Sequence, residues 1–145
     1  MIDVVIEDPA WEEALPNVEA LVLQAAAAAV PDREIAILLT SDAAIHAMND
    51  QFRGQDKPTN VLSFPAGDMA GDHLGDIALA YGVCAREAGE QGKSLTHHLQ
   101  HLVAHGALHL VGYDHEDDAD ADAMEAKERE ILAGLGIADP YASER

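Results

Sequence analysis

Three histidines stand close together in the segment HGALHLVGYDH, residues 105–115. His105 and His109 are four residues apart, so on a helix both imidazoles lie on one face. Gly112 follows and can adopt a positive φ, which would turn the chain back and bring His115 toward the same point. Three neutral imidazoles with one open coordination position are typical of a catalytic zinc site, and no thiolate cluster accompanies them. The spacing therefore predicts a zinc ion held by His105, His109 and His115.

Two alternatives remain open around this segment. His101 and His105 are also four residues apart, and spacing alone does not exclude that pair. The downstream pair is favoured because it continues into a glycine and a third histidine. Asp114 could orient a metal ligand from behind or serve as a turn residue, and the turn is favoured. The other histidines are expected to be packed or surface residues: His46, His73, His97, His98 and His101.

The residue after the first histidine is Gly106. The segment matches the metzincin pattern H-E-x-x-H-x-x-G-x-x-H except at this position, where metzincins carry the glutamate that acts as general base in peptide hydrolysis. A glycine lacks that base, so the pattern indicates a zincin-type metal site used for another hydrolysis. The acidic run that follows does not fit a calcium loop, because Ala123 and Arg129 occupy the glycine and glutamate positions of an EF-hand counted from Asp118.

The elements that must position these residues follow from hydrophobic periodicity and capping signals. A long apolar helix is expected over 94–112, with Ser94 as its cap and Gly112 as its stop. Other helices are expected over 11–30, 41–52, 81–92 and 118–136, with Pro16 near the effective start of the first. Strands are expected over 4–8, 34–40, 60–65 and 75–80. Without strict βαβ alternation, this order predicts an α+β fold with a small mixed sheet packed by helices.

Length and composition set further limits. The chain has 145 residues and is 48% hydrophobic, which predicts a single domain, 1–145, with a real core. The longest apolar run, 21–30, is shorter than the ~20 residues a membrane helix needs. The N-terminus has no basic region typical of a signal peptide, and the single Cys84 cannot form an internal disulfide. A reducing cytoplasm is therefore expected.

A second informative segment spans residues 49–65 and contains Arg53 and Lys57, two of only 8 basic residues. An arginine near a metal can neutralise charge that develops on a phosphate. The alternative is a turn with incidental charge. The net charge of −19, from 27 acidic residues against these 8, argues against tight nonspecific binding to nucleic acid.

Four segments, DKPTNVLSFP, LGDIALA, HGALHLVGYDH and MEAKEREILAGLG, resemble in this order the YbeY family of bacterial endoribonucleases and rRNA maturation factors. The resemblance covers residues 40–141. It implies an α+β, zincin-like domain with a four-stranded sheet. It also implies one Zn²⁺ per chain, bound by His105, His109 and His115, and a functionally important arginine at Arg53.

The resemblance further implies a zinc-dependent, single-strand-specific endoribonuclease of the cytoplasm. It would act in 3′-end maturation of the 16S small-subunit rRNA and in ribosome quality control. Its partners would be RNA, the small ribosomal subunit and an assembly GTPase, with no membrane association. Partners that deliver the RNA, or a local basic groove around Arg53 and Lys57, would reconcile this activity with the acidic charge. A zinc metallopeptidase and a non-catalytic ribosome assembly factor with a structural metal remain alternatives.

Overall fold

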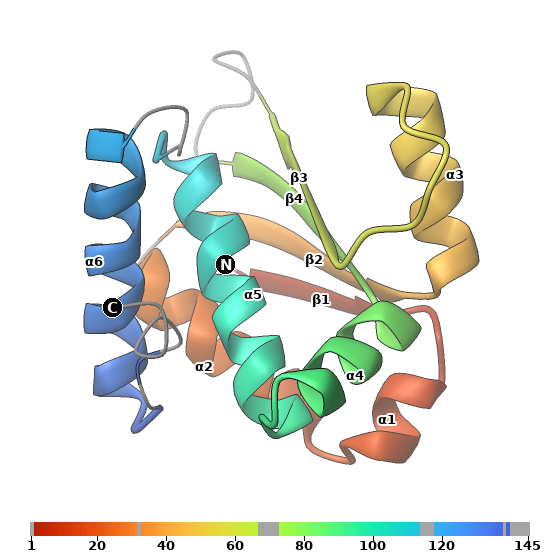
Figure 1. Ribbon diagram of the computed structural model, residues 1–145, viewed down its shortest axis with the longest axis horizontal. Helices are drawn as coiled ribbons and strands as arrows, with labels where there is room; N and C mark the ends of the chain where they lie inside the picture. The colour runs from red at the N-terminus through yellow and green to blue at the C-terminus, as the bar shows by residue number, and fades with distance from the viewer. Residues whose placement is uncertain (1, 32, 67–72, 114–117, 138, 140–145) are drawn as a thin grey trace.

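The computed structural model describes residues 2–31, 33–66, 73–113, 118–137 and 139 (Figure 1). The strands are β1 (Ile2–Ile6), β2 (Glu34–Thr40), β3 (Val61–Pro65) and β4 (His73–Ala80). The helices are α1 (Ala10–Ala14), α2 (Val18–Ala29), α3 (Asp42–Arg53), α4 (Tyr81–Glu90), α5 (Leu95–Leu110) and α6 (Asp118–Gly134).

The four strands form one mixed sheet in the order β1-β2-β4-β3. Strands β1, β2 and β4 run parallel, and β3 pairs antiparallel with β4 at the sheet edge. The predicted α+β class and the four-stranded mixed sheet are therefore confirmed. No helix among the described residues is long and apolar enough to cross a membrane.

Two predicted elements differ from the structure near the N-terminus. Strand β1 covers residues 2–6 instead of 4–8, because the amides of Glu7 and Asp8 both donate to the carbonyl of Leu39 and end the regular ladder. The helix expected over 11–30 is split into α1 and α2. Leu15 precedes Pro16 and is extended (φ −132°, ψ 90°), a conformation that proline favours in the residue before it.

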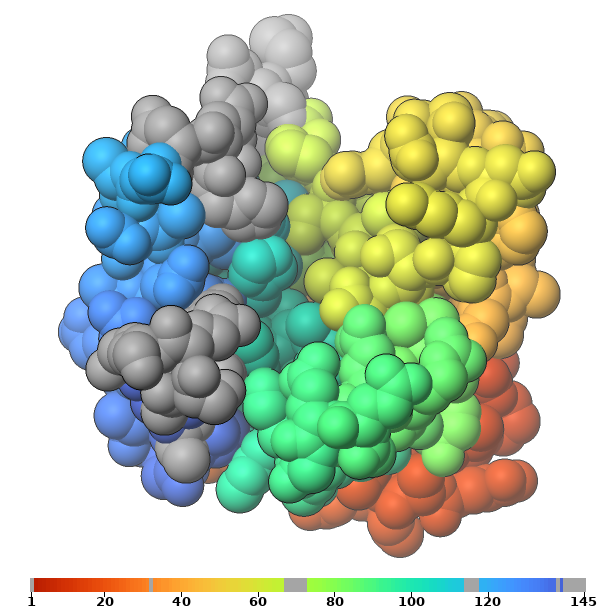
Figure 2. Space-filling view, viewed as in Figure 1, coloured from red at the N-terminus to blue at the C-terminus, as the bar shows by residue number. Residues whose placement is uncertain are grey.

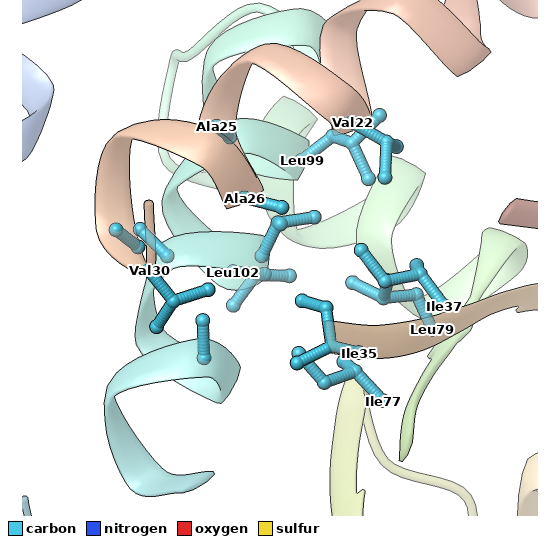
Figure 3. Packing of buried hydrophobic residues seen from close by; sticks show 14 of the residues in the cluster. Val22, Ala25, Ala26, Val30, Ile35, Ile37, Ile77, Leu79, Leu99 and Leu102 are labelled. Carbon is cyan, nitrogen blue, oxygen red and sulfur yellow. The ribbon is translucent and has the colours of Figure 1, made fainter. Parts of the chain in front are cut away.

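The main core lies between one face of the sheet and helices α2 and α5. Side chains alternate along a strand, so every second residue of β2 and β4 points to this face. The small alanines on α2 let that helix approach the sheet and α5 closely. Figure 3 shows the facing residues: Ile35, Ile37, Ile77 and Leu79 from the strands, and Val22, Ala25, Ala26, Leu99 and Leu102 from the helices.

Helix α3 packs on the opposite face of the sheet through Ile45, which contacts a smaller cluster that includes Leu62 and Ala78. Helix α6 lies beside α5 on the α2 side, so α5 is enclosed by the sheet, α2 and α6 (Figure 1). This arrangement places α5 next to β3 and makes one side of that helix the wall of a pocket.

Candidate functional site

Helix α5 begins and ends as its sequence predicts. The amide of His97 donates to Oγ of Ser94 at 3.1 Å, which caps the N-terminus. At the C-terminus Gly112 has φ +102°, and the amide of Tyr113 donates to the carbonyl of Leu108 at 3.0 Å. The positive φ reverses the chain, as predicted for Gly112, and brings the backbone of Tyr113 back against the helix.

His105 and His109 converge on one side of α5. Their ring centroids are 4.6 Å apart and their Nε2 atoms are 3.1 Å apart. Both rings line a pocket of about 480 Å³, which is completed by the inner face of β3 and by Arg53, Gly112 and Tyr113. Figure 2 shows α5 at the floor of a hollow between the yellow α3 region and the blue helix α6.

The Nδ1 atoms of both rings are held by hydrogen-bond acceptors. Nδ1 of His105 lies 2.7 Å from Oε1 of Glu128, and Nδ1 of His109 lies 3.0 Å from the carbonyl oxygen of Tyr113. A carboxylate and a carbonyl accept hydrogen bonds and do not donate them, so each neutral ring carries its hydrogen on Nδ1. Each Nε2 then presents a lone pair, which is the atom a metal ion binds.

This arrangement fits a metal ion. In neutral rings of this tautomer neither Nε2 carries a hydrogen, so the two lone pairs repel each other at 3.1 Å unless a proton or a metal cation is shared between them. Imidazole nitrogen is a preferred zinc ligand. Within the described residues, no group of three histidine, cysteine, aspartate or glutamate side chains is placed to hold a metal ion. His115, the third predicted ligand, and Asp114 lie outside the described residues.

The alternative pair, His101 and His105, does not converge in the same way. Their ring centroids are 6.4 Å apart, and Nε2 of His101 lies 3.3 Å from Oε1 of Glu128. His101 lines a different pocket, near Lys93 and His97. The geometry therefore favours His105 and His109 as the pair that faces a common ligand.

The remaining described histidines take part in other contacts. His98 is buried, and its Nε2 lies 3.0 Å from Oε1 of Glu87. Burial lowers the pKa of His98 below its ordinary value of 6.5, although the hydrogen bond to Glu87 opposes this shift. His46 pairs with Asp56, His73 pairs with Asp76, and His97 is exposed at the start of α5.

Arg53 reaches the same pocket from the other face of the sheet. It is the last residue of α3, and Gly54 ends the helix in the left-handed region with φ +67°. Its Nη2 donates to the carbonyl of Ser63 at 3.0 Å, on the edge strand β3. Lys57, which the sequence grouped with Arg53, is not among the residues described as lining the pocket. The structure thus brings Arg53 together with His105 and His109.

Gly106 lies where α5 crosses the sheet. A Cβ atom at this position would be 3.1 Å from Cγ2 of Ile77 and 3.1 Å from Oγ of Ser63. The Ser63 hydroxyl also donates to the carbonyl of Gly106 at 3.2 Å. A side chain at residue 106 would therefore be directed at the sheet, and close packing explains the glycine that replaces the metzincin glutamate.

Glu128 is a member of this site that the spacing of the histidines does not predict. Its side chain is fully buried on α6, on the helix stripe that also buries Met124, Ile131 and Leu132. Positions 124, 128, 131 and 132 have the i, i+4, i+7, i+8 spacing of a core-facing stripe, where an acidic residue is unusual. The acidic residue in this otherwise apolar stripe is the feature of the sequence that could have identified Glu128 as a candidate site residue.

Comparison with known proteins agrees with the predicted resemblance. The family model described as Endoribonuclease YbeY matches residues 4–136. Endoribonuclease YbeY of Rhodopseudomonas palustris strain HaA2 is 53% identical, over 98% of this chain and 82% of that protein. Endoribonuclease YbeY of Maricaulis maris strain MCS10 is 52% identical, over 99% of this chain and 92% of that protein.

A solved structure supports the same fold. The solution structure of TM1509 from Thermotoga maritima has a TM-score of 0.60 and 27% identity, and the match covers 100% of this chain and 96% of that one. The predicted family and the predicted class of enzyme are confirmed. The chain belongs to the endoribonuclease YbeY family of RNA-cleaving hydrolases.

Proposed function

We propose that this chain is a zinc-dependent, single-strand-specific endoribonuclease with one Zn²⁺ bound by His105, His109 and His115. The observation that carries this proposal is the pair of Nε2 atoms 3.1 Å apart on the pocket, each on a ring whose Nδ1 faces an acceptor. Zinc in such a site supplies Lewis-acid chemistry, which polarises a phosphoryl oxygen and makes water a better nucleophile at neutral pH.

In this proposal Arg53 is the catalytic residue that stabilises negative charge on the phosphate. Arg53 lines the pocket that holds both imidazoles, and the hydrogen bond from its Nη2 to the carbonyl of Ser63 tethers the guanidinium to the edge strand. A guanidinium has five N–H donors and binds phosphate oxygens well. Arg53 can therefore hold a phosphodiester against the histidine pair while keeping its contact with the edge strand.

The proposed biological role is maturation of the 3′ end of 16S rRNA and ribosome quality control in the cytoplasm. The small ribosomal subunit and an assembly GTPase are the proposed partners. The net charge of −19 supports delivery of the RNA by such partners, since a protein this acidic attracts free RNA poorly. If partners deliver the RNA, this chain itself needs to contact few phosphates, and its binding to RNA should then depend only weakly on salt concentration. About three contacts to a single strand would give a log–log slope of only about −2.

The decisive experiment is cleavage of a single-stranded RNA by metal-free protein with zinc added back, comparing wild type with His109→Ala and Arg53→Ala. His97→Ala is the matched control, because His97 is exposed on the same helix. Cleavage that requires zinc, survives in His97→Ala and is lost in the other two variants supports the proposal. Wild-type cleavage without any metal would contradict it.

The same samples separate the two alternative functions. A peptide library incubated with the zinc form tests the metallopeptidase, which Gly106 disfavours because it provides no general base. A complementation assay tests the assembly factor with a structural metal. That function would persist in Arg53→Ala, while His109→Ala would unfold the protein. A 2′,3′-cyclic phosphate on the RNA product would show that the 2′-hydroxyl is the nucleophile and would exclude direct attack by water.

A further inference from the structure

Glu128 is a buried carboxylate with two imidazole partners. It belongs to α6, its side chain is fully buried, and its Oε1 lies 2.7 Å from Nδ1 of His105 and 3.3 Å from Nε2 of His101. Burying a carboxylate is costly unless it is paired and hydrogen-bonded. An acidic side chain at a position where the helix stripe is otherwise apolar points to a role beyond packing.

We propose that Glu128 is a positioning residue, whose carboxylate accepts the Nδ1 hydrogen of His105 and so holds Nε2 of that ring as a lone pair directed into the pocket. This role rests on the proposed function, because its consequence is tighter binding of the proposed zinc ion by His105. Carboxylates that accept from a ligating histidine fix its tautomer and orientation and make it a stronger ligand.

The two histidines of the pair are held in unequal ways. The acceptor for His109 is a backbone carbonyl, that of Tyr113, which the turn at Gly112 places beside the ring. The acceptor for His105 is a side chain from a different helix, so it can be removed by substitution. The contact with His101 gives the same Glu128 oxygen a second neighbour and restrains the carboxylate between two turns of α5.

The test compares wild type with Glu128→Leu and Glu128→Gln. Leucine removes the acceptor and fits an apolar helix stripe, whereas glutamine keeps one acceptor oxygen and removes the charge. Glu130→Gln is the matched control, because Glu130 lies two residues further along α6 and is exposed. Two readouts are needed: zinc affinity by competition with a chromophoric chelator, and the tautomer of His105 by ¹⁵N NMR of the metal-free protein.

We expect zinc affinity to fall about 10- to 100-fold in Glu128→Leu, by less in Glu128→Gln, and not at all in Glu130→Gln. The Nδ1–H tautomer of His105 should dominate in wild type and be lost in Glu128→Leu. If that variant fails to fold, Glu128→Gln provides the comparison. Unchanged affinity and an unchanged His105 tautomer in the folded variants would overturn the inference.

The two readouts also separate this inference from the proposed function. Wild type that binds no zinc would refute the proposed metal site, yet the NMR spectra would still show whether Glu128 sets the tautomer of His105. Loss of the Nδ1–H form in Glu128→Leu, which removes the acceptor, would then support the positioning role. Retention of that form in folded Glu128→Leu would refute the positioning role independently.

Discussion

The close approach of α5 to the sheet at Gly106 predicts an unusual response to alanine. In a helix interior, replacing glycine with alanine stabilises by roughly 1 kcal/mol through helix propensity. At residue 106 the new Cβ would lie 3.1 Å from both Cγ2 of Ile77 and Oγ of Ser63. Overpacking a core contact costs about 1–3 kcal/mol. The two effects oppose each other, so Gly106→Ala should destabilise the protein by about 0–2 kcal/mol.

Gly89 provides the matched control. It lies within α4, and a Cβ added there has no heavy atom within 4 Å among the described surroundings. Gly89→Ala should therefore gain the helix propensity alone and stabilise the protein by about 1 kcal/mol. The difference between the two substitutions, about 1–3 kcal/mol, measures the close contact at residue 106. Urea unfolding followed by far-UV circular dichroism gives both free energies of unfolding.

The same reasoning extends to Gly106→Glu, which restores the metzincin glutamate. That side chain would be directed at Ile77 and Ser63 and would bury a carboxylate, so we expect a loss of more than about 3 kcal/mol and no gain of peptidase activity. A Gly106→Ala variant as stable as Gly89→Ala would refute the packing argument. A folded Gly106→Glu variant that cleaves peptides would refute the explanation of why the glutamate is absent.

Three further predictions concern other parts of the chain. Arg53→Ala should lower the rate of RNA cleavage about 10²- to 10³-fold with little change in stability, as for loss of one charge-stabilising donor. Lys57→Ala should lower the cleavage rate far less. Equal losses of rate in the two variants would contradict the role of Arg53. Burial lowers the pKa of His98 below 6.5, so the unfolded chain binds more protons and the free energy of unfolding should decrease as pH falls below about 6.5. Urea titrations repeated across the pH range should show a shallower decrease in His98→Gln. The same pH dependence of the free energy of unfolding in both proteins would contradict a lowered His98 pKa. Burial raises the pKa of the Cys84 thiol well above its usual range, so a thiol reagent should label it only in urea, and rapid labelling of the native protein would contradict its burial.

Local signals in the sequence were sufficient for the helix that carries the histidines. Ser94 as cap, Gly112 with positive φ, and the shared face of His105 and His109 all follow from short-range rules of helix geometry and capping. The same rules predicted the helix over 41–52, which packs through Ile45, and Arg53 is the last residue of that helix in the structure. The α+β class also followed, because hydrophobic periodicity determines the type of each element.

Contacts between distant segments were not predictable in this way. The sheet order β1-β2-β4-β3 puts β3 at the edge, where Arg53 reaches the carbonyl of Ser63 beside α5. The partnership of Glu128 with His105 joins two residues that are 23 positions apart in the chain and lie on different helices. Periodicity marks Glu128 as buried but does not identify its partner, since that depends on how α5 and α6 pack.

The most direct test of the account is the metal content of protein purified without added metal, measured by mass spectrometry for wild type, His109→Ala and the control His97→Ala. Circular dichroism on each sample establishes that it is folded. We predict about one zinc per chain in wild type and in His97→Ala, and none in His109→Ala. Folded wild-type protein without metal, or a His109→Ala variant that retains its zinc, would contradict the assignment of this pocket as the metal centre.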